Sequence, residues 1–139
     1  MKNFLFTAAF ALMFGSAFAQ KMKAAAVPAA ITAKFIATYP KAEDAKWEKE
    51  GDKYEAEFEL NEVETSAVFD ASGNVLETEV EIKVSELPKA VTDYMTGKKV
   101  KEASRITDAA GKITYEAESG GKDYIFDDAG KFIKTVEGD

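Results

Sequence analysis

Residues 53–60 read KYEAEFEL, and after the first lysine this stretch alternates strictly between apolar and acidic side chains. Residues 76–82 read LETEVEI and alternate in the same way. A period of two is typical of a β-strand with one face in a core and the other in water. The two stretches therefore predict an antiparallel sheet whose exposed face carries six glutamates: Glu55, Glu57, Glu59, Glu77, Glu79 and Glu81.

Three segments of the first half of the chain recur, in the same order, in the second half. The matching pairs are residues 27–31 and 87–91, 54–57 and 115–118, and 67–76 and 124–133. Similar strands and turns can resemble one another singly, but an ordered set of matches predicts an internal repeat. Phe69 and Phe126 would then occupy equivalent strand positions, each before a hairpin turn that Gly73 or Gly130 closes.

Each repeat begins with a short helix, for which a proline such as Pro28 suits the first turn. Ile31 and Phe35 give the first helix an apolar stripe. Phe58 and Leu60 should point at this stripe, while Glu57 and Glu59 point away. Short turn signals between the strands favour hairpins over crossovers. We expect an α+β fold of two tandem helix-plus-antiparallel-meander units, with up to eight strands joined in one sheet and both helices on one face.

The first residues have the three parts of a secretory signal. Lys2 is followed by an apolar run over residues 4–14, and Ala17 and Ala19 then form a small-residue cleavage motif. The run is shorter than the roughly 20 residues that span a bilayer, so we expect cleavage after Ala19 and no membrane insertion afterwards. The predicted location is the periplasm or the cell exterior. The predicted divisions are a signal peptide at 1–19, a flexible lead-in at 20–26, a first α+β4 unit at 27–84 and a second at 85–139, one compact domain overall.

The composition excludes several classes of function. Cys and His are both 0, so the chain has no disulfide, no thiolate nucleophile and no imidazole to act as a base or metal ligand. Lys+Arg is 18 against Asp+Glu 25, which gives a net charge of −7 and a pI of about 4.8. Nucleic-acid binders need a basic surface. We therefore expect no catalytic residues, no cofactor, no metal site and no nucleic-acid partner.

Several short motifs resemble the PepSY-like, β-lactamase-inhibitor-like family of periplasmic proteins. They are Pro28-x-Ala30-Ile31, Tyr39-Pro40-Lys41-Ala42, Trp47, Tyr54-Glu55-Ala56-Glu57-Phe58, and Val68-Phe69-Asp70 with Gly73, and in the second repeat Leu87-Pro88-Lys89-Ala90-Val91 and Phe126-Asp127-Asp128-Ala129-Gly130. The resemblance covers residues 27–137. It implies tandem helix-plus-four-strand units in one curved antiparallel sheet, and it supplies no catalytic set. A shared fold alone does not assign the inhibitor function.

Two features have both a functional and a structural interpretation. The six glutamates could form a docking surface for a basic protein, a cationic peptide or divalent cations, or a solvated face that keeps the protein soluble. Asp70-Ala71-Ser72-Gly73-Asn74 and Asp127-Asp128-Ala129-Gly130 lack the ligand series of a calcium loop and are predicted to be turns. Trp47 is expected in the core.

We therefore predict a non-enzymatic periplasmic or secreted binding module that recognises a protein or peptide through its sheet face, with inhibition of an extracellular enzyme as one form of that recognition. Two other functions stay open: a hydrolase that uses paired carboxylates, and a cation-binding envelope protein. The chain is expected to be a monomer.

Overall fold

The computed structural model describes residues 19–138, so the predicted signal peptide lies outside the described residues apart from Ala19. The chain forms two compact units that divide between Thr78 and Glu79. The sequence predicted the division after residue 84. The division instead falls inside a strand, β5 (Val75–Ile82).

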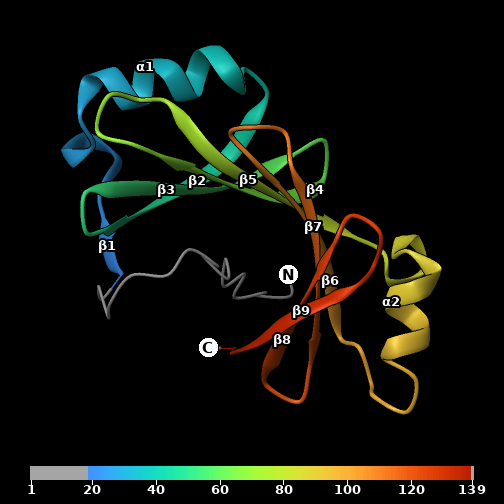
Figure 1. Cartoon of the computed structure of the whole chain (residues 1–139). Helices are drawn as coiled ribbons and strands as arrows, with labels where there is room; N and C mark the ends of the chain where they lie inside the picture. Colours follow the sequence, from blue (N-terminus) through green and yellow to red (C-terminus); the bar gives the residue numbers. More distant parts are fainter. Residues whose placement is uncertain (1–18, 139) are drawn as a thin grey trace. The chain divides into compact units, whose positions relative to one another are not determined.

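The first unit is one helix on an antiparallel meander (Figure 1). Its elements, with β5 shared, are β1 (Gln20–Met22), the 3-10 helix η1 (Ala24–Ala26), α1 (Ala29–Thr38), β2 (Ala42–Glu50), β3 (Lys53–Leu60) and β4 (Val63–Phe69). The end of α1 agrees with the sequence, because Tyr39 precedes Pro40 and leaves helical geometry at φ −125°.

The lead-in over residues 20–26 has regular structure that the sequence did not predict. Strand β1 pairs antiparallel with β2 and places Met22 opposite Trp47. Met22 packs against the core of the first unit. Within residues 19–138 this strand brings the total to nine, one more than the sequence predicted, and the strand order is the chain order from β1 to β9.

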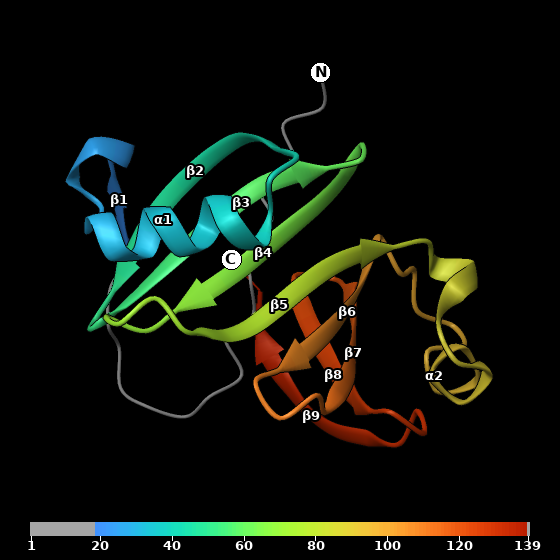
Figure 2. The same ribbon diagram turned by 90° about the horizontal axis from the view of Figure 1, so that it is seen from above.

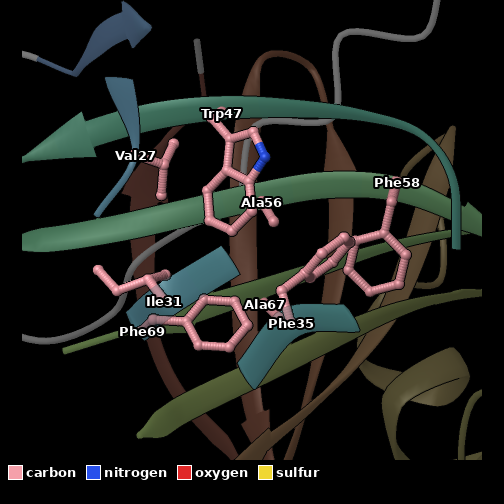
Figure 3. Close-up of a cluster of buried hydrophobic side chains, with 8 residues drawn as sticks. All are labelled: Val27, Ile31, Phe35, Trp47, Ala56, Phe58, Ala67 and Phe69. Atoms are coloured by element: carbon pink, nitrogen blue, oxygen red, sulfur yellow. The ribbon is translucent and has the colours of Figure 1, made fainter. Parts of the chain in front are cut away.

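The core of the first unit lies between α1 and the sheet (Figure 3). Its buried members are Val27, Ile31, Phe35, Trp47, Ala56, Phe58, Ala67 and Phe69. The ring of Phe35 stands at its centre, with centroids 5.2 Å from Trp47 and 5.0 Å from Phe58 in edge-on geometry, the arrangement that aromatic quadrupoles prefer. The predictions that Phe58 faces the helix and that Trp47 is a core residue are confirmed.

The second unit repeats this plan (Figure 2). Its elements are the 3-10 helix η2 (Val84–Glu86), α2 (Lys89–Tyr94), β6 (Glu102–Asp108), β7 (Ile113–Ser119), β8 (Lys122–Asp127) and β9 (Phe132–Glu137). Val91 and Met95 pack against Phe126 in its core. Tyr94 stacks on Phe132 at 4.8 Å, with an interplanar angle of 9°. The predicted α+β fold of helix-plus-meander units is confirmed.

Equivalent residues of the two units occupy equivalent places. Phe69 and Phe126 are both fully buried, and each precedes an aspartate-led hairpin turn that Gly73 or Gly130 closes by donating its N–H to that aspartate's carbonyl. Both glycines have positive φ, +85° and +80°, and both lie against the helix of their own unit. The predicted equivalence of these positions is confirmed.

The expectation of a sheet with one buried and one solvated face is wrong for part of each unit. Five consecutive residues of β4, from Thr65 to Phe69, are buried, so both faces of this strand are covered. In the second unit the same holds for neighbouring residues of β8, Ile125 and Phe126, which are 2% and 0% exposed. Alternation gives the direction in which a side chain points, but the burial of that side chain depends on what covers the face.

Candidate partner-binding face

The three glutamates of β3 point away from α1, as the sequence predicts. The residues between them, Ala56 and Phe58, are buried in the helix-side core, and successive strand residues point to opposite faces. Their exposure differs along the strand: Glu59 is exposed, whereas Glu55 and Glu57 are half-buried.

The glutamates of β5 do not share this exposure. Glu77 is 7% exposed and Glu79 is 2% exposed, and both have interactions within the fold. Glu81 is half-buried. The predicted solvated face of six glutamates is therefore wrong at Glu77 and Glu79. A carboxylate at these depths is not available to a partner, and burial of a charge is tolerated where it is paired or hydrogen-bonded.

The pairing of β2, β3 and β4 instead assembles three glutamates in one row across the sheet. Glu43 is the Cα partner of Glu59, and Glu59 is the partner of Glu64. Glu43 and Glu59 are exposed and Glu64 is half-buried. We call these three residues the acidic row. The row lies on β2, β3 and β4 of the first unit and includes no residue of β5.

The sequence missed Glu43 and Glu64 because their alignment depends on a local irregularity. The register between β2 and β3 shifts between Glu43 and Lys46, and Asp44 adopts a positive φ of 53° within this bulge. A bulge inserts an extra residue into one strand and changes which side chains stand opposite each other. Asp44 is among the residue types that tolerate positive φ, but that signal alone does not locate a bulge.

Glu57 lies on the same strand as Glu59 of the acidic row, and its pKa is raised. Burial is the main cause that raises the pKa of Glu57 above its ordinary value, and the neighbouring charges of Glu48 and Glu64 raise it further. Lys46 and Lys21 act in the opposite direction but do not reverse the effect. Burial, more than the neighbouring charges, therefore disfavours the ionised form of Glu57.

The aspartate-led turns are structural, as predicted. The Oδ1 atom of Asp70 accepts hydrogen bonds from the backbone N–H groups of Ser72 and Asn74 at 2.8 and 2.9 Å. Asp127 accepts the corresponding pair from Ala129 and Lys131 at 3.0 and 2.8 Å. These bonds engage the Oδ1 atom of each aspartate in closing the turn. In the part of the chain that the structure describes, no three acidic side chains gather closely enough to hold a metal ion.

A family model matches the chain in two overlapping segments, residues 17–66 and residues 52–134. The family is described as "Putative beta-lactamase-inhibitor-like, PepSY-like". The chain belongs to this PepSY-like family. The double match agrees with the two helix-plus-meander units and with the resemblance seen in the sequence motifs.

Solved structures from three Bacteroides species share the PepSY-like fold of this chain. One of the "putative periplasmic proteins" of Bacteroides eggerthii DSM 20697 is 16% identical, with a TM-score of 0.72 over 80% of this chain and 88% of the other. A DUF2874 family protein of Bacteroides uniformis ATCC 8492 is 20% identical, with a TM-score of 0.72 over 79% and 88%. A BLIP-like protein of Bacteroides fragilis NCTC 9343 is 27% identical, with a TM-score of 0.62 over 79% and 85%.

No curated protein matches the chain. None of the helices within residues 19–138 has the length and apolar character needed to cross a membrane.

Proposed function

We propose that this PepSY-like protein is a non-enzymatic, exported binding module that recognises a basic protein or peptide through the acidic row. The observation that carries the proposal is the alignment of Glu43, Glu59 and Glu64 across three neighbouring strands. Like charges directly opposite one another destabilise a sheet. Solubility alone needs no such alignment, since dispersed charges would serve it, whereas a cationic partner would offset the repulsion between the exposed pair Glu43 and Glu59.

The family supports a binding role rather than catalysis. Its description is "Putative beta-lactamase-inhibitor-like", and the structural neighbour from Bacteroides fragilis is BLIP-like at 27% identity. Another neighbour is described as periplasmic, which supports export, as do the signal features of residues 1–19. Paired-carboxylate hydrolysis would need two acids opposed across a substrate, whereas the acidic row projects from a single face.

The test is affinity capture, in which the immobilised protein is exposed to a periplasmic extract. Purified β-lactamase is tested in the same way as a defined candidate partner. Three forms are compared: the unmodified protein, the variant Glu43→Lys/Glu59→Lys, and the control Asp52→Lys/Asp128→Lys, which changes the net charge equally at exposed hairpin positions. A protein retained by the unmodified and control forms and lost by the acidic-row variant supports the proposal. Equal retention by all three forms contradicts it.

A further inference from the structure

Strand β9 forms an edge of the sheet. Within residues 19–138 its strand neighbour is β8 alone, and Figure 2 shows both strands in red. An edge strand presents N–H and C=O groups that another chain can pair with. The chemistry of this edge depends on which residues of β9 direct those groups outward.

The pairing with β8 identifies these residues. The N–H of Gly138 donates to the carbonyl of Gly121 at 2.9 Å, so these two residues form a hydrogen-bonded pair. Hydrogen-bonded and non-hydrogen-bonded pairs alternate along an antiparallel ladder. Val136 therefore directs its backbone groups toward β8, whereas Thr135 and Glu137 direct theirs outward, away from the sheet.

The edge is only partly protected against strand pairing, by the bulge at Ile133 and the charged side chains of Lys134 and Glu137. At the opposite edge, β1 has only 3 residues and β2 is interrupted by the bulge after Glu43. In β9 the register shift lies at the start of the strand and leaves Ile133 out of the ladder, while residues 134–137 pair regularly with β8. No proline occurs in residues 132–138, although short strands, charged side chains, prolines and bulges are all common means of protecting an edge.

The geometry points to a second copy of this chain as the occupant of the edge, added antiparallel through its own β9 around a two-fold axis at Val136. In this register Thr135 forms hydrogen-bonded pairs with the partner's Glu137, and Val136 faces the partner's Val136. Lys134 lies opposite the partner's Gly138. No like charges stand opposite each other, which favours the pairing.

Neighbouring symmetric registers are less favourable. An axis at Lys134 places two lysines opposite each other, which is destabilising. An axis at Thr135 needs the bulged Ile133 to pair with the partner's Glu137.

Because each copy carries a net charge of −7, long-range repulsion opposes association, and screening by salt should strengthen the dimer. This inference replaces the monomer expected from the sequence and is independent of the acidic row.

The register is tested by single-cysteine oxidation, since the native chain has no cysteine. At the axis, Val136 would form a non-hydrogen-bonded pair with Cα atoms about 4.5 Å apart, which suits a disulfide. Val136→Cys should form a covalent dimer at least about tenfold faster than the exposed-turn control Ala109→Cys, because pairing raises the local thiol concentration. Equal rates for the two variants overturn the inference.

A second experiment separates the edge from the fold. Thr135→Pro removes the backbone N–H of residue 135, which points outward and donates no hydrogen bond to β8. Thr135→Val keeps this N–H. Sedimentation equilibrium should show dimers for the unmodified protein and Thr135→Val. For Thr135→Pro the dissociation constant should rise about ten- to hundredfold, with an unchanged circular dichroism spectrum. A monomer at every protein and salt concentration, or equal dimerisation of Thr135→Pro, overturns the inference.

Discussion

The backbone of Gly130 lies directly against Ala90 of α2, where a Cβ atom built on the glycine would stand 2.8 Å from the Ala90 Cβ. The first unit has the corresponding contact, because a Cβ on Gly73 would stand 3.1 Å from the carbonyl oxygen of Ala30 in α1. In both units a turn at the end of a buried strand therefore fixes how closely the helix approaches the sheet.

Gly130→Ala should lower the free energy of unfolding by about 2–5 kcal/mol, because positive φ and overpacking against α2 both add cost. Gly111→Ala is the matched control, since Gly111 has a φ of +82° and no atom within 4 Å of the added Cβ. The control should cost only about 1–2 kcal/mol. Urea unfolding of both variants measures the difference, and equal losses would show that α2 does not pack as closely as the structure has it.

Phe58→Ala should lower the free energy of unfolding by about 3–5 kcal/mol. The ring is 5% exposed and lies 5.0 Å from the ring of Phe35 and 4.7 Å from that of Tyr39, so its removal leaves a cavity under α1. Chemical denaturation followed by Trp47 fluorescence reports on the same core. A loss below about 1 kcal/mol, the range of surface substitutions, would contradict this packing.

Glu57→Gln should stabilise the protein at pH 7. The pKa of Glu57 is raised in the folded state, chiefly by burial, so its charged form is less favourable there than in the unfolded chain. This destabilisation is present above the folded pKa and disappears as the pH falls below the ordinary value of 4.5. Thermal unfolding of Glu57→Gln and of the exposed control Glu62→Gln, from pH 3 to pH 7, should show a gain for the first variant alone, and only at the higher pH.

Asp70→Ala should destabilise the first unit, with the opposite pH dependence. Hydrogen bonds from Asn74, the side chain first, lower the pKa of Asp70. Their stabilisation is present above the ordinary pKa and is lost as the pH falls through the lowered value. The gap in urea midpoint between wild type and Asp70→Ala should therefore narrow in acid. Asp128→Ala, at an exposed turn position of the second unit, should leave the midpoint nearly unchanged.

The direction of side chains could be predicted from the sequence, but their burial could not. Alternation in β3 places Phe58 in the core and Glu57 on the opposite face, because strand geometry alone decides it. The same rule in β5 gives the direction of Glu79 but not its 2% exposure, since that depends on what lies above the sheet. Strand β1 was not predicted from the sequence. Of its residues, only Met22 packs against the core, so the strand has no alternating apolar pattern.

The location of the candidate site also depended on tertiary pairing. Glu59 was identified from its strand, whereas Glu43 and Glu64 join it only through the register on either side of β3. The bulge that sets one of these registers leaves no periodic pattern in the sequence, because it breaks the period instead of following it.

The most direct test of recognition through the acidic row is the dissociation constant of the captured partner as a function of salt concentration. It is measured by calorimetry for the unmodified protein and for Glu43→Gln/Glu59→Gln, which removes two charges and keeps the side-chain shape. We predict that the unmodified protein binds less tightly as salt rises and that the double variant binds at least about tenfold more weakly at low salt with a shallower salt dependence. Equal affinities and equal salt dependences for the two forms would contradict recognition through this face.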